Sequence, residues 1–226
     1  MRRFLFLLLI GLAGAAVLVA LGNWQIRRLA WKQAVLAEIS ARIDEAPVPL
    51  PANPDPERDR YLAVEVQGTM EPGEIDVLVS TKALGAGYRV IAPFVTDTGR
   101  RILIDRGFIP ATDKGAPRGI GPMSVTGNLH WPQEIDSFTP EPDLAANIWF
   151  ARDVPMLAKE LRTEPVLLVA RSENDPAITP LPVSTEGIPN DHLQYAVTWY
   201  GLALIWAVMT LYFLWRTRAR SRSIKR

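Results

Sequence analysis

The 226-residue sequence contains no cysteine and only two histidines, His130 and His192. The absence of cysteine excludes disulfides, thiolate metal sites, haem attachment through a C-x-x-C-H motif and redox relays. The sequence also lacks a G-x-S-x-G elbow, a P-loop, an H-E-x-x-H motif and a complete G-x-G-x-x-G motif. Most metalloenzyme and nucleophile–base designs are therefore excluded. An enzyme of another kind would need a polar cleft lined with convergent titratable groups.

Two long runs without a charged residue are present, Phe4 to Leu21 and Tyr195 to Trp215, with 18 and 21 residues. Each is about the length that crosses a hydrocarbon core ~30 Å thick. The first run fits a retained transmembrane helix, because it continues past the small-residue site at residues 13–15 and ends at Trp24, an interfacial residue type. A cleaved signal peptide is the alternative. We predict transmembrane helices over residues 1–22 and 195–215.

The net charge of +1 hides a marked asymmetry along the chain. All 24 acidic residues lie between Gly22 and Tyr195, against 17 Lys and Arg, whereas the other eight basic residues lie at the two ends. Basic residues close to membrane helices tend to stay in the cytoplasm. We therefore expect both termini to lie in the cytoplasm and residues 23–194 to be exported. The basic tail, residues 216–226, suits anionic lipids better than nucleic acid.

The segment between the two runs begins as a helix. Helical spacing of apolar residues from Leu29 predicts that the first helix continues to about Ile43. Five prolines between residues 47 and 56 then mark an irregular linker. Short β-like runs follow from Tyr61, with a hairpin predicted at residues 96–99.

A short helix and a last strand complete the predicted domain. The helix covers Val154 to Leu161, with Asp153 as its N-cap and Pro155 in its first turn. The buried strand lies in the sequence PVLLVARS. The predicted fold class is an α+β membrane protein with two transmembrane helices flanking a mostly antiparallel, β-rich exported domain.

The second apolar run carries the candidate site. On a helix, His192, Tyr195, Trp199, Trp206 and Phe213 share one face. A neutral imidazole at a membrane interface can ligate haem iron, and the aromatic residues would flank the macrocycle. The alternative is an ordinary first-turn histidine behind a capping box, with aromatic residues that only anchor the helix.

Trp24, Gln25 and Arg28 follow the first helix, and we expect them at the same membrane face as His192, where they are candidate haem contacts. Gln25 and Arg28 are three residues apart and project to one side of a continuing helix. Arg28 has three candidate partners: a haem propionate, a carboxylate of the domain or a lipid phosphate. We interpret His130, in a predicted strand, as structural.

Three motifs together resemble the surfeit-locus family of assembly factors for haem–copper cytochrome c oxidase. They are LGNWQIRRLAWK after the first helix, GYRVIAPFVTDTGRRILIDRGFIP in the middle, and NDHLQYAVTWYGLALIW at the second helix. Their order and the architecture of two helices around an exported domain match as well. Phe108, where many members carry tryptophan, and Asp105, where asparagine is common, depart from the pattern.

The resemblance implies a non-enzymatic helper that delivers or inserts haem A into the catalytic subunit of the oxidase, with haem A synthase as a further partner. It implies that His192 is the haem-iron ligand, with Tyr195 and Trp199 shaping the pocket. It also implies fold-supporting roles for Gly87, Arg106 and Gly107. A scaffold that binds the oxidase subunit without holding haem is the competing hypothesis.

Overall fold

The computed structural model describes residues 2–186 and 188–223, and it divides the chain into two compact units. One unit holds the C-terminal helix and the N-terminal helix as far as Glu38, and the other spans Ile39–Thr185. The last three residues of the predicted basic tail lie outside the described residues.

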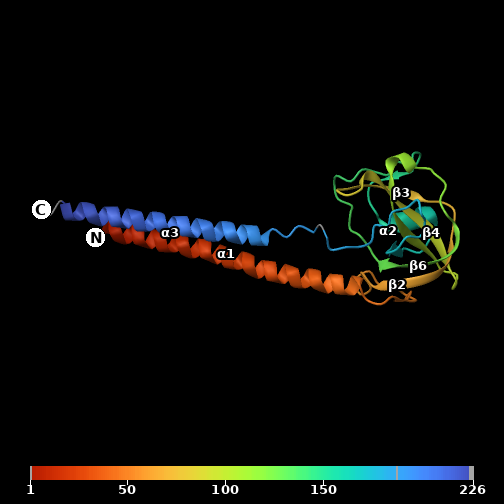
Figure 1. Ribbon diagram of the computed structural model, residues 1–226, viewed down its shortest axis with the longest axis horizontal. Coiled ribbons are helices and arrows are strands. Elements are labelled where there is room, and N and C mark those ends of the chain that lie inside the picture. Colours follow the sequence, from red (N-terminus) through yellow and green to blue (C-terminus); the bar gives the residue numbers. More distant parts are fainter. Residues whose placement is uncertain (1, 187, 224–226) are drawn as a thin grey trace. The chain divides into compact units, whose positions relative to one another are not determined.

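The helical unit is an antiparallel pair, α1 (Arg2–Ile43) and α3 (His192–Ser223). Figure 1 shows α1 and α3 side by side, with the first residues of α1 and the last residues of α3 at the same end of the pair. Among the described residues, these are the two helices long and apolar enough to cross a membrane. The predicted extension of the first helix to Ile43 is confirmed, whereas α3 begins three residues earlier than predicted and continues beyond Trp215.

Glycines of α1 let the two helices approach closely. A Cβ atom placed on Gly11, Gly14 or Gly22 would lie 2.1–2.6 Å from side-chain atoms of Thr210, Trp206 and Tyr200 of α3. Two polar contacts join the same surfaces: the Trp206 indole donates to the carbonyl of Gly11 (3.0 Å), and the Tyr200 hydroxyl donates to Asn23 Oδ1 (2.7 Å). Close backbone approach at small residues is the usual way in which membrane helices pack.

The other unit is a sheet with one α-helix and one 3-10 turn. The strands are β1 (Val48–Pro49), β2 (Ala63–Met70), β3 (Ile75–Thr81), β4 (Gly85–Thr96), β5 (Arg101–Pro110), β6 (Gly121–Leu129), β7 (Ile148–Trp149) and β8 (Leu167–Ala170). The turn η1 covers Ala111–Asp113, and the helix α2 covers Val154–Leu161. Asp153 caps α2, since its side chain accepts a hydrogen bond from the Met156 amide (2.8 Å), as predicted.

The sheet closes into a barrel, which the sequence did not predict. Its strands follow the order β2-β6-β8-β5-β4, and a further pairing of β4 with β2 completes the circle. The long strand β4 makes this possible, because its first half pairs with β3 and its last residues, Phe94–Thr96, pair with β2. All pairs within the barrel are antiparallel except β5 with β8.

Two apolar cores follow from the two-residue alternation of the strands. The first fills the barrel and draws on all five of its strands, with Phe94, Ile102, Ile104 and Leu168 fully buried. The second lies on the outer surface of β3, β4, β5 and β8, where α2 and Trp149 cover it. Strand β8 is buried on both faces, which explains its uninterrupted apolar sequence.

Strand β5 contains a β-bulge at the Arg106–Gly107 pair. Asp105 pairs with Ile91 and Gly107 pairs with the next residue back, Val90, so that Arg106 is the extra residue. Gly107 has a φ of +124°, and a Cβ atom there would lie 2.3 Å from the carbonyl oxygen of Thr179. Only glycine fits both conditions. Bulges commonly redirect a side chain, and this one directs Arg106 towards the segment after β8.

Candidate functional site

The first turn of α3 places His192 against Gln25 of α1. The imidazole Nδ1 and the amide Oε1 of Gln25 are 2.7 Å apart, and Gln25 is buried while His192 is half-buried. An amide oxygen can only accept, so Nδ1 must carry the proton in this contact. The neutral ring then has its lone pair on Nε2, the atom with which it can ligate a metal.

The chain that enters α3 is fixed to the same face of α1. Lys32, seven residues after Gln25, donates to the carbonyl of Pro189. Asn190 lies between this contact and His192, and its Oδ1 is buried with no hydrogen-bond partner in the described part of the chain. An unpaired buried acceptor costs stability. Among the described residues, Asn190 Oδ1 is therefore a free acceptor two residues from His192.

The aromatic stripe of α3 lies at the edge of the helix interface. The buried face consists of Ala196, Ala203 and Leu214. At about 100° per residue, Tyr195, Trp206 and Phe213 lie about 60–80° round the helix from Ala203. All three are more than one-third exposed, and Trp199 is half-buried. Of the five predicted stripe residues, His192 and Trp199 are therefore nearest to the buried face.

Trp24 and Arg28 are exposed neighbours of the buried Gln25 on α1. By helical geometry they are about 100° and 60° away from it. Trp24 is 52% exposed. The Arg28 guanidinium lies 3.9 Å from the ring centroid of Trp31, in a cation–π contact. The structure thus brings Gln25 to His192 and places Trp24 and Arg28 in an exposed stripe with Trp31.

An apolar groove of about 140 Å³ lies towards the other end of the helix pair. It is lined by Leu7, Ile10, Gly11, Trp206, Met209, Thr210 and Phe213. Trp206 is 14 residues beyond His192, or about 21 Å along a helix that rises 1.5 Å per residue. The groove is therefore separate from the histidine.

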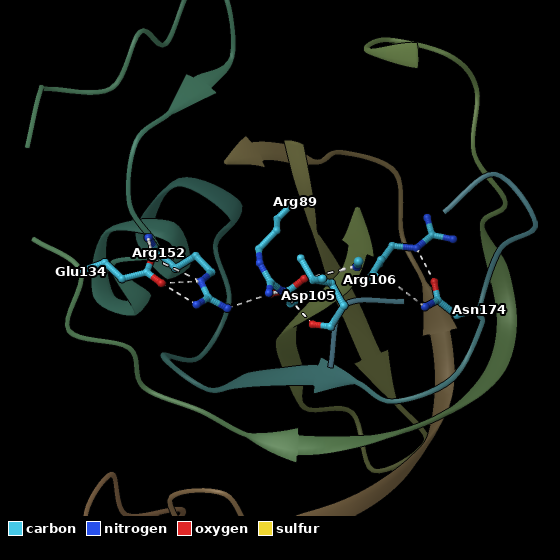
Figure 2. A network of polar contacts seen from close by, with 8 residues as sticks. Arg89, Asp105, Arg106, Glu134, Arg152 and Asn174 are labelled. Carbon is cyan, nitrogen blue, oxygen red and sulfur yellow. Dashed lines mark hydrogen bonds and ion pairs between the residues drawn. The ribbon is translucent and has the colours of Figure 1, made fainter. Parts of the chain in front are cut away.

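The barrel unit contains a network of charged side chains around Asp105, shown in Figure 2. The fully buried Asp105 carboxylate accepts hydrogen bonds from Arg89 Nη1 (2.7 Å) and Arg152 Nη1 (3.2 Å). Arg152 also donates to Glu134 Oε1 (2.5 Å). Burial alone would raise the pKa of Glu134, but the hydrogen bonds and charge of Arg152 outweigh it and lower that pKa. The residues pair within the network, so we interpret it as structural.

Arg106 belongs to a second buried pair. Its Nε donates to Asn174 Oδ1 (2.8 Å) and its Nη2 donates to Asp175 Oδ2 (3.1 Å), and both Arg106 and Asp175 are buried. Gly87 is equally constrained, because a Cβ atom there would lie 2.1 Å from the carbonyl oxygen of Ile109. These contacts agree with fold-supporting roles for Gly87, Arg106 and Gly107.

His130 packs inside the barrel unit, with its ring stacked on Tyr61 at 5.5 Å between centroids. Burial lowers the pKa of His130 to about 4, and the charges of Arg152 and Arg60 act in the same direction. The imidazole is therefore neutral at pH 7. This environment agrees with a structural role.

A cleft of about 530 Å³ lies between the Arg60 segment and the start of α2. It is lined by Pro56, Glu57, Arg60, Trp131, Pro132, Gln133, Asp153, Val154 and Pro155. The Asp153 carboxylate already caps α2, which leaves Glu57 and Arg60 as its remaining charged groups. That set does not form an acid–base pair around a nucleophile.

Sequence reasoning did not anticipate Asn190, Lys32 or the contact of Arg28 with Trp31. Asn190 and Lys32 both lie inside the family motifs quoted above, and this position was the one sequence feature that could have pointed to them as site residues. Which atoms they meet depends on how far α3 is shifted along α1, and no local pattern specifies that shift.

Fold and site together define a barrel protein with a pair of apolar helices that carry a histidine–glutamine contact. The chain matches the SURF1 family over residues 12–204 and belongs to that family. It is 31% identical over 210 residues to Surfeit locus protein 1 of Homo sapiens, covering 81% of this chain and 69% of that protein. It is 27% identical over 221 residues to a SURF1-like protein of Rickettsia bellii, covering 92% and 90%.

Proposed function

We propose that this protein is a membrane-anchored assembly factor for haem–copper cytochrome c oxidase, and that it holds haem A for delivery to the catalytic subunit. Membership of the SURF1 family supports the role in oxidase assembly. Haem A is the cargo of this protein and not a catalytic cofactor. His192 is the iron ligand, and Gln25 orients it.

The contact between His192 and Gln25 carries the haem part of the proposal. Metal-ligating histidines commonly donate their second ring nitrogen to a carbonyl or carboxylate oxygen, which fixes the tautomer and the ring orientation. Gln25 supplies that oxygen at 2.7 Å. The unpartnered Oδ1 of Asn190, two residues away, adds an acceptor for a polar substituent of the cargo. The residues present therefore fit a haem bound through one axial histidine.

The remaining predicted haem contacts have different degrees of support. Trp199 is half-buried on the side of α3 that carries His192, which suits a wall of the pocket. Tyr195 is 55% exposed, so it would line an open side. Arg28 would reach the cargo only if its guanidinium left Trp31, and Trp24 lies in the same exposed stripe. We therefore propose His192, Gln25 and Trp199 as the central contacts.

The proposed location is the bacterial inner membrane, with both termini cytoplasmic and the barrel periplasmic. The antiparallel helix pair supports this arrangement, because a pair that crosses a bilayer leaves both chain ends on one side (Figure 1). The basic residues near both ends favour the cytoplasm for that side. Reporter fusions after Arg226 should be active only with cytoplasmic-type reporters, and a periplasmic signal would contradict this topology.

The pigment of the purified protein tests haem binding. Protein produced together with the haem A pathway should purify with a Soret band, and His192→Ala should lose most of it. His130→Ala is the matched control, because it removes the other histidine of the chain, and its Soret band should match that of the unchanged protein. A colourless preparation that still captures the catalytic subunit would refute haem binding and favour the scaffold hypothesis.

A further inference from the structure

The segment between β6 and β7 is a long loop that leaves large apolar side chains in solvent. Residues 130–147 connect Leu129 to Ile148 with no helix or extended strand. Loops of this length within a compact domain are uncommon and usually functional. Phe138 is 88% exposed, the highest value among the exposed large apolar residues of the described chain, and Ile135 and Leu144 are 52% and 62% exposed.

Hydrogen bonds hold the tip of this loop in one conformation. The Asp136 carboxylate accepts from the Phe138 amide (2.8 Å) and from the Thr139 hydroxyl (3.0 Å), while the Asp136 amide donates to Thr139 Oγ1 (2.9 Å). The backbone amide of Phe138 and the hydroxyl of Thr139 lower the pKa of Asp136, so its carboxylate stays ionised at neutral pH. The exposed phenyl ring is thus presented on a pre-formed turn.

The two ends of the loop are fixed as well. At the start, Glu134 is bound by Arg152, which the buried Asp105 holds in turn. At the end, the Asp143 side chain accepts from the Ala146 amide (2.9 Å), and the backbone groups of Asp143 and Ile148 exchange two hydrogen bonds of 2.9 Å. Binding through such a loop loses little conformational entropy, because the contact residue is already positioned.

The charge around Phe138 indicates what can cover it. Glu134, Asp136, Glu141 and Asp143 give the loop four carboxylates, whereas residues 130–147 contain no Lys or Arg. An anionic membrane surface would be repelled by this charge. A protein surface with an apolar pocket surrounded by Lys and Arg would be attracted, and aromatic anchors in such pockets are typical centres of binding energy.

We propose that residues 133–147, which we call the acidic loop, form a docking site for the oxidase catalytic subunit, with the Phe138 ring inserted into an apolar pocket that has a basic rim. This inference rests on the proposed function, since it names the same partner. The new element is the surface of the barrel unit that contacts this partner. The cargo site in the helix pair plays no part in it.

A photo-crosslinker tests the contact directly in the full-length protein in its membrane. Benzoyl-phenylalanine in place of Phe138 should form an adduct with the catalytic subunit, while the same group in place of Ile120, which is 58% exposed elsewhere on the barrel unit, should not. An adduct with lipid at position 138 would overturn the proposal in favour of membrane docking. An adduct at neither position would overturn it as well.

Capture of the catalytic subunit by the purified protein measures how much the Phe138 side chain and the acidic loop contribute to binding. Phe138→Ala should reduce capture by at least about tenfold, as expected for an anchor residue, and Ile120→Ala should leave it unchanged. Glu141→Lys should weaken capture by several-fold, and added salt should reduce the difference from the unchanged protein. Equal capture by Phe138→Ala and the unchanged protein would refute the docking site. If the unchanged protein captures no catalytic subunit, the proposed function itself fails, and this partner fails with it.

Discussion

Replacing Asp105 by asparagine tests whether the charge network around this buried carboxylate holds the barrel closed. The substitution keeps the shape of the side chain, so no cavity forms, but it removes the carboxylate charge that Arg89 and Arg152 share. Arg152 keeps Glu134 as a partner, whereas Arg89 keeps only the carbonyl of Leu181 (3.0 Å). The change therefore leaves the Arg89 guanidinium, whose side chain is only 13% exposed, without a carboxylate.

The loss of unfolding free energy follows from the burial of Asp105 in its pair with Arg89. Two unit charges about 3 Å apart attract by about 5 kcal/mol at an effective dielectric constant of 20. Removing one partner of a buried pair costs about 3–5 kcal/mol, and the asparagine oxygen, which still accepts a hydrogen bond, places Asp105→Asn at about 3 kcal/mol. The control is Glu71→Gln, which removes the charge from the half-exposed pair of Glu71 with Arg101 (2.5 Å) and should cost no more than about 1 kcal/mol.

Thiol labelling gives the assay, because the chain has no cysteine of its own. A single cysteine at Ala170, which is buried in the barrel core, reacts only when the barrel opens. A loss of about 3 kcal/mol should accelerate labelling by about 150-fold in Asp105→Asn, while Glu71→Gln should change it by about fivefold at most. Equal acceleration by the two substitutions would refute the argument that burial makes the Asp105 pair decisive.

Three further predictions follow from single residues. Gln25→Leu should weaken haem binding by about 10- to 100-fold in a spectroscopic titration, because the imidazole of His192 loses its orienting acceptor, and an unchanged affinity would refute that role. Because the folded-state pKa of His130 is about 4 and its ordinary value is 6.5, the barrel should lose about 2–3 kcal/mol of stability as pH falls from 6.5 to 4. His130→Phe should show a smaller drop in melting temperature between pH 7.5 and pH 4.5, and an equal drop would contradict this assignment. Gly107→Ala should destabilise the barrel by about 2–4 kcal/mol in chemical denaturation, because the new methyl group would meet the Thr179 carbonyl. Gly115→Ala is the control, since Gly115 has a positive φ but lies in open space, and it should cost about 1 kcal/mol. Similar costs for the two substitutions would refute the steric argument.

Local signals predicted the helical parts of the fold well. The end of α1 at Ile43, the bounds of α2 and its Asp153 cap each depend on residues within a few positions of one another, and each prediction is confirmed. Barrel closure was not predicted because it depends on pairings between distant segments. Strand β8 has only four residues, and its sequence does not indicate that it pairs with β5 in parallel and with β6 in antiparallel orientation.

The charged pair Asp105 and Arg106 shows the limit of hydrophobic patterning. Both residues lie in a strand that is buried on both faces, where alternation would place apolar side chains. Their partners, Arg89 and Asp175, are supplied by other segments, so only the assembled fold explains why charge is tolerated there.

The candidate site was predicted in part. The positions of His192 and Gln25 at the ends of the two apolar runs predicted that both lie at the same membrane face, and the structure joins them. The same spacing grouped Tyr195 and Phe213 with His192, but the buried face of α3 follows Ala196 and Ala203, because close helix packing selects small residues over aromatic ones. The Arg28 guanidinium packs on the ring of Trp31, three residues further along the same helix, and this partner was not among those considered from the sequence.

The position of β8 in the barrel has a consequence for biosynthesis. Strand β8 is the last strand to be synthesised, yet it lies between β5 and β6 and pairs with one edge of each. Until Leu167–Ala170 emerges, the facing edges of β5 and β6 are unpaired and can pair with other chains. A ribosome stalled before residue 170, or a nonsense codon there, would release a chain that has nearly all of the barrel sequence and no closed barrel. We expect such a product to be cleared by proteases, so that truncations near the end of the barrel act as null alleles.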